Sequence, residues 1–404
     1  MSSSGLPNKT ASSFATPLVM FSVLATGIGQ SMTFTLLAPL GREVGFAEIQ
    51  VGLIISCSSL AFTLTSPLWG RKSDLWGRKP VLLLGMVGYT LGAALFAAVF
   101  TFGLKGLLSG MTLYLLVISA RVLMASLMSA APSAASAYIA DTTSAEQRVA
   151  GMGRLGAART LGAILGPATC GILATIGLLT PLYIGVAIAL VSTILLVIIL
   201  QEPPLSVPRS APRQKLKLLD KRYFPYILVG FLTFLAFSMT SQTMGFYIQD
   251  RFVLDGKDTA QALGSGMMVA ACMSFFAQAF LAGRLKLTPI RLMTFGLPIL
   301  MTSYGLLLFA DSIATLVIFL GVLGLGLGMV SPGFTAGASL AVGPNEQGAV
   351  SGLVSSCPAA GFVLGPILGT SLYQIDHTLP YICSLVLMLP LTVYVWWFGR
   401  RERR

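Results

Sequence analysis

Apolar residues follow one another along this chain in blocks that are too long for the elements of a water-soluble domain. No Asp, Glu, Lys or Arg interrupts residues 10–41, 49–70, 160–201, 312–345 or 347–375. About 20 apolar residues are needed to cross a hydrocarbon core roughly 30 Å thick. In lipid, every backbone amide must also be satisfied within its own segment. The pattern therefore predicts an all-α membrane protein.

The blocks and the turn signals between them predict twelve spans. The block over 160–201 is long enough for two helices, and Gly177-Leu-Leu-Thr-Pro181 supplies the turn between them. The first block is too long for a cleaved signal peptide and lacks a small-residue cleavage site, so it is expected to be the first span. The spans are expected at about 15–39, 50–69, 80–100, 111–139, 148–176, 180–200, 224–248, 262–283, 290–309, 312–338, 347–373 and 379–398.

Composition and charge agree with a membrane protein. Of the 404 residues, 55% are hydrophobic and 10% are charged, and the mean hydropathy is +0.84, whereas a soluble domain carries about 25% charged residues. Of the 26 Lys and Arg residues, 20 fall between spans on the side of the N-terminus and four on the opposite side. Because cytoplasmic loops carry such an excess, both termini are expected in the cytoplasm. The net charge of +12 is attributed to membrane insertion and anionic lipid, and no nucleic-acid partner is expected.

The two halves of the chain resemble each other as copies. Three landmarks recur 199 or 200 residues later: Pro132 as Pro332, Glu146 as Glu346, and Gly162-x-x-x-Gly166-Pro167 as Gly361-x-x-x-Gly365-Pro366. Each copy holds six spans, so both copies insert the same way up and form parallel repeats around an axis along the membrane normal. The chain is expected to divide into an N-terminal six-helix bundle over 1–200, a cytoplasmic linker over 201–222 and a C-terminal six-helix bundle over 223–404.

Four segments resemble sequence motifs of the major facilitator superfamily. Gly70-Arg-Lys-Ser-Asp74-Leu-Trp-Gly77-Arg78-Lys79 is similar to its G-x-x-x-D-x-x-G-R-K signature, motif A. Leu116 to Arg121 is similar to the intramembrane arginine motif of proton-coupled members, although Met124-Ala125 stands where the family usually has Gln-Gly. Gly162-x-x-x-Gly166-Pro167-x-x-x-Gly171 resembles the span-five motif of antiporters, and Tyr138-Ile-Ala-Asp141 followed by Arg148 fits the twelve-span drug:proton antiporter branch.

The resemblance implies a gate at the cytoplasmic side, in which Asp74 and Arg78 pair near Asp141 at the end of span four and latch one conformation. Gly70 and Gly77 are expected to let the chain turn sharply. In the alternative interpretation, the basic residues of the motif only set the topology. The gate residues are Gly70, Asp74, Gly77, Arg78, Lys79 and Asp141.

The span-five motif is expected to form a close helix contact. Small residues four positions apart let two helices pack backbone to backbone, and Pro167 introduces a kink that suits a hinge. Tight packing without motion is the alternative. The residues of this motif are Gly162, Gly166, Pro167 and Gly171.

Two arginines, Arg121 and Arg159, lie within the predicted spans. A cation at such depth usually faces a cavity or a partner, although Arg159 can instead snorkel to the interface. None of the 14 acidic residues lies deep in a span, and Gln30 occupies the stretch of span one where many drug exporters carry a carboxylate. Deep arginines without deep acids favour a substrate that bears a carboxylate.

By the resemblance, the walls of a substrate cavity come from spans one, four, seven and ten. Phe234, Ser238 and Gln242 share one helical face, and a polar stripe in a lipid-buried helix is expected to face a cavity. Aromatic and Met residues can equally be core packing. The candidates for the substrate and proton pathway are Arg121, Arg159, Gln30, Thr33, Met124, Met128, Phe234, Ser238, Gln242, Tyr247, Met329 and Phe334.

These features predict a proton-coupled secondary transporter that exports a small organic molecule by alternating access. The favoured substrate is a carboxylate-bearing metabolite such as a citrate-type siderophore. The alternatives are a broad multidrug or antibiotic efflux pump, an importer of the same fold, and a membrane receptor that transports nothing. ATP hydrolysis is not supported, because the sequence has no G-x-x-x-x-G-K-[ST] loop.

The expected partners are an anionic or zwitterionic small molecule, protons and the lipid bilayer. The chain is expected to act as a monomer in the bacterial inner membrane. We expect no enzymatic activity, no cofactor and no metal site, since the five cysteines all fall in spans without a C-x-x-C pair. The single histidine, His377, is expected to be a solvated loop residue.

Overall fold

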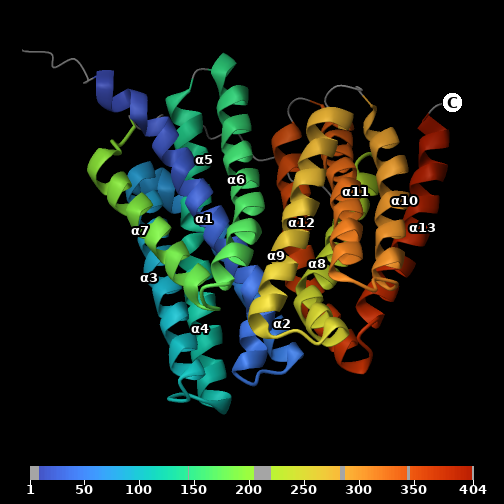
Figure 1. Cartoon of the computed structure of the whole chain (residues 1–404). Coiled ribbons are helices and arrows are strands. Elements are labelled where there is room, and N and C mark those ends of the chain that lie inside the picture. Colours follow the sequence, from blue (N-terminus) through green and yellow to red (C-terminus); the bar gives the residue numbers. More distant parts are fainter. Residues whose placement is uncertain (1–8, 144, 204–219, 283–286, 344–345, 403–404) are drawn as a thin grey trace, which may run out of the picture. The chain divides into compact units, whose positions relative to one another are not determined.

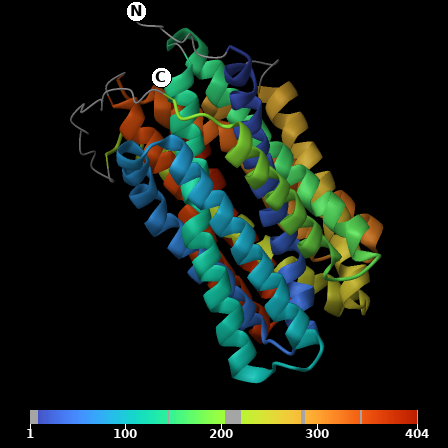
Figure 2. The same cartoon turned by 90° about the vertical axis from the view of Figure 1, so that its left-hand side faces the viewer.

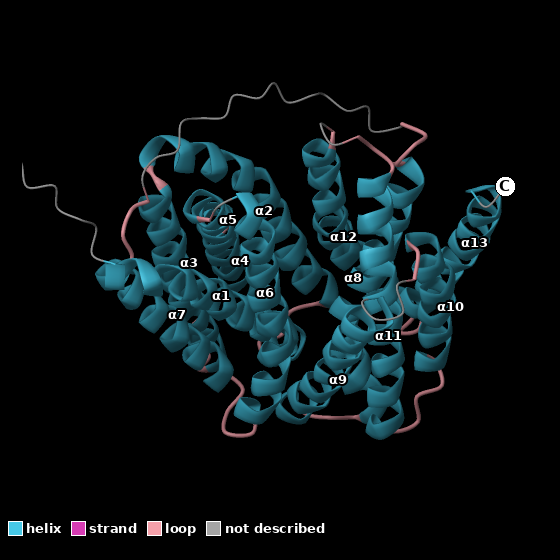
Figure 3. Ribbon diagram, turned by 90° about the horizontal axis from the view of Figure 1, so that it is seen from above, coloured by secondary structure: helices cyan, strands magenta, loops and turns pink. Residues whose placement is uncertain are grey.

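The structure is a computed structural model that describes residues 9–143, 145–203, 220–282, 287–343 and 346–402. Every regular element in these ranges is a helix (Figure 3). Within them, twelve segments are long and apolar enough to cross a membrane. The all-α fold with twelve spans is therefore confirmed.

The elements are α1 (Lys9–Glu43), α2 (Glu48–Trp76), α3 (Arg78–Leu104), α4 (Gly110–Met128), α5 (Ala130–Thr142), α6 (Ala145–Ala174), α7 (Thr180–Ile199), α8 (Phe224–Phe252), α9 (Gly256–Phe276), the π-helix η1 (Ala277–Ala282), α10 (Pro289–Leu307), α11 (Ile313–Leu340), α12 (Gln347–Ile375) and α13 (Leu379–Glu402) (Figure 1).

The span predicted at 111–139 is interrupted at Ser129, where α4 ends and α5 begins. Pro132 has no N–H to donate to the carbonyl of Met128, so one backbone hydrogen bond of the helix is missing at this point. The hydroxyl of Ser129 donates to the carbonyl of Ser126 at 2.9 Å. Pro332, the corresponding residue of the second half, lies inside an unbroken α11.

The span predicted at 262–283 begins earlier, at Gly256. Its N-cap is Asp255, whose carboxylate accepts a hydrogen bond from the N–H of Asp258 at 2.7 Å. Such a cap satisfies one of the N–H groups that have no partner at a helix start. The polar residues that begin α9 were therefore wrongly assigned to a loop.

The chain folds into two compact units, which we describe separately. Unit 1 comprises Met1–Phe34, Cys57–Thr169 and Leu179–Arg209. In this unit α3 packs against α4, α5 and α7, and Figure 2 shows α3 and α4 as neighbours joined by a short connection. The core of unit 1 includes the fully buried side chains of Val81, Leu82, Met86, Ala134, Ile139 and Leu196.

Unit 2 comprises Thr35–Ser56, Cys170–Leu178 and Ser210–Arg404. Here α12 packs against α8, and α11 packs against α9 and α10. The end of α1 and the start of α2 belong to this unit, where a Cβ added at Gly245 of α8 would lie 2.7 Å from Cβ of Ala38. The predicted domains with a linker over 201–222 stay a prediction, because residues 204–219 lie outside the described residues.

Candidate functional site

The predicted gate motif forms an ion-pair cluster around Arg78 in unit 1. Nη1 of Arg78 lies 2.5 Å from Oδ1 of Asp74 in α2, and its Nε lies 2.7 Å from Oδ2 of Asp141 in α5. Nη1 also donates to the hydroxyl of Ser73 at 3.1 Å. Two carboxylates from different helices thus share one guanidinium, which donates along several directions in its plane. The expected pairing of Asp74, Arg78 and Asp141 is present, and its action as a latch stays a prediction.

Glu202, which the sequence did not single out, caps the first turn of α3 beside this cluster. Its Oε1 accepts from the backbone N–H of Arg78 at 2.5 Å, and its Oε2 accepts from the N–H of Lys79 at 2.8 Å. These N–H groups have no acceptor within the helix, and the helix dipole favours a carboxylate at this end. Glu202 therefore ties the segment that follows α7 to the gate motif.

The two glycines of the gate motif differ in their surroundings. Gly77 has a φ of +100°, and a Cβ added there would lie 2.7 Å from Oε1 of Glu202, so glycine is needed for both reasons. Gly70 lies inside α2 with nothing within 4 Å of an added Cβ. The sharp turn expected at Gly70 is wrong, because α2 continues to Trp76 and the chain turns at Gly77.

The glycine motif of α6 packs closely against α1 within unit 1. A Cβ added at Gly162 would lie 2.9 Å from Cα of Gly27, and one added at Gly166 would overlap Oγ of Ser31. The hydroxyl of Ser31 also donates to the carbonyl of Gly162 at 3.1 Å. The expected backbone-to-backbone contact is present. Pro167 lies within α6 without ending it, and a hinge there stays a prediction.

Further along α6, the last glycine of the motif, Gly171, belongs to unit 2. A Cβ added there would lie 3.3 Å from the carbonyl oxygen of Gln261 in α9.

The copy of the motif in unit 2 makes the same kind of contact between α12 and α8. A Cβ added at Gly361 would lie 2.7 Å from the carbonyl carbon of Phe234, and one at Gly365 would lie 2.6 Å from Cβ of Ser238. In both halves the glycines thus press the fifth helix of the repeat onto the first. Ser238, a predicted cavity residue, is fully buried in this contact.

Arg121, in α4, is enclosed by aromatic side chains in unit 1. Its guanidinium carbon lies 5.4 Å from the ring centre of Phe34 and 5.8 Å from that of Phe96, distances at which a cation is attracted to the ring face. Its Nη1 approaches the sulfur of Met124 at 3.9 Å, and its Nε has no hydrogen-bond partner among the described residues. The side chain is 1% exposed. Direct contact with a substrate, which stays a prediction, would therefore require this cage to open.

The other pathway candidates differ in exposure. Arg159 is exposed, and Gln30 and Phe234 are half-buried. The buried candidates are Thr33, Met124, Met128, Gln242, Tyr247, Met329 and Phe334. Tyr247 donates from its hydroxyl to the carbonyl of Leu307 at 2.9 Å. Their place in a substrate path stays a prediction.

The described residues enclose a small cavity in unit 1 and line an open groove in unit 2. In unit 1 a cavity of about 10 Å³ lies next to Thr33, Tyr89, Phe96 and Met124, which is room for about one water molecule. In unit 2 a more open groove of about 520 Å³ separates α11 from α12. Its lining is apolar or hydroxyl-bearing and consists of Pro332, Thr335, Ala336, Ser339, Val350, Ser351, Val354 and Ser355.

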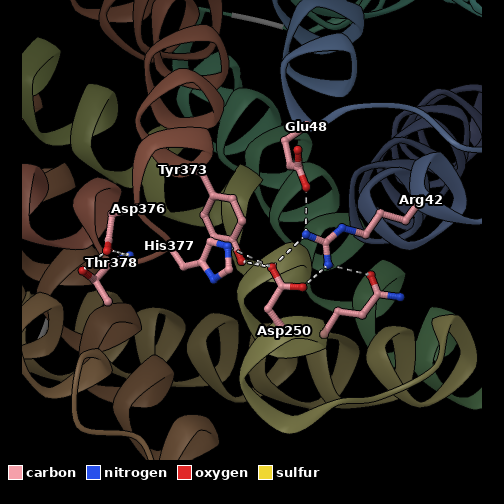
Figure 4. A network of polar contacts seen from close by, with 8 residues as sticks. Arg42, Glu48, Asp250, Tyr373, Asp376, His377 and Thr378 are labelled. Carbon is pink, nitrogen blue, oxygen red and sulfur yellow. Dashed lines mark hydrogen bonds and ion pairs between the residues drawn. The ribbon is translucent and has the colours of Figure 1, made fainter.

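A polar network that the sequence did not predict lies at helix ends in unit 2 (Figure 4). Arg42, near the end of α1, forms two bonds with the carboxylate of Asp250 in α8, at 2.5 Å and 2.8 Å. Its Nη2 also lies 2.8 Å from Oε1 of Glu48. The hydroxyl of Tyr373 in α12 donates to Oδ2 of Asp250 at 2.6 Å. Nε2 of His377 lies 3.8 Å from the same oxygen. Long sequence separation hid this cluster, since Arg42 and Asp250 belong to different halves of the chain.

A third ion-pair cluster lies outside the spans of unit 2. Arg222 bonds to Asp220 at 2.8 Å and to Glu346 at 2.9 Å. Hydrogen bonds from Arg222 lower the pKa of the Glu346 carboxyl. Hydrogen bonds to Asp220 and Glu346 raise the pKa of Arg222. Because the cluster is exposed, it contributes little to stability.

Comparison with known sequences finds relatives along almost the whole chain. Multidrug resistance protein 1 of Bacillus subtilis (strain 168) is 26% identical over 364 residues, which is 88% of this chain and 89% of that protein. Quinolone resistance protein NorA of Staphylococcus aureus (strain N315) is 23% identical over 387 residues, which is 94% of this chain and 95% of that protein.

Solved structures and a family model agree on the fold. The inward-facing crystal structure of a bacterial homologue of the iron transporter ferroportin superposes with a TM-score of 0.72 at 18% identity, covering 94% of this chain and 97% of that one. An inward-facing, occupied bacterial homologue of the human lysosomal transporter Spinster gives a TM-score of 0.72 at 11% identity, covering 96% and 97%. The model of the Major Facilitator Superfamily matches residues 19–357 and 279–404. This multi-pass membrane protein therefore belongs to the Major Facilitator Superfamily of transporters.

Proposed function

We propose that this chain exports drug-like organic molecules across a bacterial cytoplasmic membrane in exchange for protons. The observation that carries the proposal is its similarity, over more than four fifths of its length, to a multidrug resistance protein and a quinolone resistance protein. This similarity favours the alternative prediction, a broad multidrug efflux pump, over the export of a carboxylate-bearing metabolite that the sequence analysis preferred. The positive charge bias supports cytoplasmic termini.

The groove between α11 and α12 supports a drug-like substrate. Its volume of about 520 Å³ falls in the range of small-molecule sites, about 300–1,000 Å³. Four of its lining residues carry hydroxyls and none carries a charge: Thr335, Ser339, Ser351 and Ser355. Hydroxyls can donate or accept, so such a lining accommodates varied neutral groups better than a single charged one.

An exported carboxylate-bearing metabolite is the second candidate, because of Arg121. Its Nε lacks a hydrogen-bond partner, and it makes no ion pair with a carboxylate among the described residues. A buried guanidinium that lacks a counter-charge is suited to a carboxylate supplied by a ligand. Closure of the aromatic cage in this conformation weighs against that function.

The test is transport by purified protein in proteoliposomes, with a proton gradient imposed in either direction. We expect gradient-driven movement of a lipophilic dye and of a quinolone, and its loss when an ionophore collapses the gradient. Transport of a citrate-type siderophore with no movement of dye or quinolone would favour the second candidate. Equal rates with and without the gradient would contradict proton exchange.

A further inference from the structure

We propose that the groove between α11 and α12 selects uncharged molecules that donate hydrogen bonds, such as primary amides. The inference rests on the proposed function, because it names the class of drug-like molecule that this groove takes. Its basis is the direction of the hydroxyl hydrogen bonds in the lining, together with the lack of a charged side chain among the described residues that line it.

The hydroxyls of the groove stand in two matched columns. Thr335 and Ser339 are four residues apart in α11, and Ser351 and Ser355 are four residues apart in α12. Side chains with this spacing lie on the same face of a helix, one above the other. Each wall of the groove therefore presents two hydroxyls to the space between the helices.

One hydroxyl on each wall already uses its hydrogen within its own helix. The hydroxyl of Thr335 donates to the carbonyl of Ser331 at 2.8 Å, and that of Ser355 donates to the carbonyl of Ser351 at 2.8 Å. A hydroxyl has one hydrogen to donate and two lone pairs that accept. Thr335 and Ser355 therefore offer a ligand acceptor positions only, unless their bonds within the helices are broken.

The rest of the lining is apolar and carries no charge. Val350 and Val354 are buried although they line the groove, so they form its inner side, and Pro332 and Ala336 complete the lining. A carboxylate binds where donors, above all cationic ones, surround it. A groove without a basic side chain, in which two of the four hydroxyls have no hydrogen to give, is therefore poorly suited to a carboxylate.

A lipid acyl chain is also a poor occupant of this groove. Hydrocarbon has no N–H or O–H group, so the free lone pairs of Thr335 and Ser355 would lack a partner against it, and a polar group without a partner in an apolar medium is costly. An N–H group of a ligand takes the place of water at these lone pairs without loss of a hydrogen bond. The apolar part of the same ligand then packs against Val350 and Val354.

The test is calorimetry on the purified protein with three probes that share one aromatic skeleton: naphthylacetamide, its N,N-dimethyl derivative and naphthylacetate. The first probe has two N–H donors, the second has none, and the third is a carboxylate. We expect naphthylacetamide to bind about tenfold more tightly than either of the others, which is the effect of one or two hydrogen bonds. Equal affinities for the two amides, or tightest binding of naphthylacetate, would overturn the inference.

Variants of the lining locate this preference in the groove. Thr335→Val and Ser355→Ala each remove an acceptor, and each should lower the ratio of the affinities for the two amides about threefold or more. The matched control is Ser356→Ala, which removes a neighbouring hydroxyl of α12 that donates to the carbonyl of Gly352 at 2.9 Å and does not line the groove. This control should keep the native ratio.

The melting temperature of each variant, measured in parallel, shows whether it is folded. A native ratio in folded Thr335→Val and Ser355→Ala, or an equal decrease in Ser356→Ala, would place the preference outside the groove and refute the inference.

Transport separates this inference from the proposed function. Proteoliposomes that move no drug, made from protein that binds the two amides with the expected ratio, would refute drug export and support the selectivity of the groove. Drug transport by protein that binds the two amides equally would refute the selectivity of the groove and support drug export.

Discussion

Arg78 and Asp141 form the more sheltered of the two ion pairs in the gate motif. The side chain of Asp141 is 15% exposed, whereas that of Asp74, the other partner of Arg78, is 58% exposed. Exposed ion pairs contribute about 0–1 kcal/mol, whereas hydrogen bonds to charged groups in sheltered sites contribute about 1.5–3 kcal/mol. The anchor of the motif in this conformation is therefore α5 rather than the neighbouring turn of α2.

Asp141→Asn should lower the thermal unfolding temperature of the detergent-purified protein clearly more than Asp74→Asn does. The first variant weakens the sheltered bond of Arg78, while the second removes a carboxylate already solvated by water. Light-scattering or fluorescence-based melting of the two variants beside the native protein provides the measurement. Equal decreases of the unfolding temperature in both variants would show that the exposure of the two ion pairs does not determine their contributions to stability.

Gly77→Ala should be destabilising, whereas Gly70→Ala should be neutral or slightly stabilising. An alanine at 77 is strained at a φ of +100° and its Cβ meets Glu202, while an alanine at 70 enters open space in a helix, where it is favoured over glycine by about 0.5–1 kcal/mol. The same melting assay, with transport measured in parallel, tests the pair. A neutral Gly77→Ala would mean that Glu202 does not cap α3 as described.

Gly162→Leu should block transport, and Gly156→Leu should be tolerated. Both residues lie in α6, but a side chain at 162 would push α6 away from Gly27 of α1, whereas nothing lies within 4 Å of a Cβ at 156. Substrate exchange in proteoliposomes at equal protein density measures the effect. Normal exchange by Gly162→Leu would show that this close helix contact is not needed for the transport cycle.

Much of the fold was predictable because an apolar chain in lipid must satisfy its backbone hydrogen bonds internally, which requires helices. Twelve spans follow from block length, and the pairing of Arg78 with Asp74 was expected from the resemblance of this segment to motif A. The errors are local. The break at Ser129 comes from the hydrogen bond that Pro132 cannot make, and the early start of α9 follows from Asp255 as an N-cap. Both signals were present in the sequence.

The network around Asp250 was not predictable in the same way. Arg42 and Asp250 are 208 residues apart, and no spacing rule connects a residue near the end of α1 with one near the end of α8. The same holds for Glu202 and Arg78, separated by 124 residues. Contacts of this kind depend on how helices pack in three dimensions, which periodicity and motifs do not specify.

The final prediction separates the two substrate classes through Arg121. Arg121→Ala should abolish binding of a carboxylate ligand if that class is transported, and Arg121→Lys should restore it only in part. A lysine keeps the attraction to Phe34 and Phe96 but cannot offer the planar, two-pronged donor that a carboxylate accepts. Arg159→Ala is the matched control, since it removes an exposed arginine of a neighbouring span, and its effect on affinity should be smaller.

Calorimetry on the purified native protein and its Arg121 variants can measure the affinities for a carboxylate ligand, its methyl ester and a lipophilic cation of similar size. Export of drug-like molecules predicts that ester and cation bind at least as well as the acid, and that Arg121→Ala changes their affinities less than about tenfold, or 1.4 kcal/mol. The melting temperature of each variant controls for loss of structure, because an empty aromatic cage at position 121 destabilises α4 by itself. Strong preference for the acid in the native protein, lost in a folded Arg121→Ala, would instead establish the anionic substrate class.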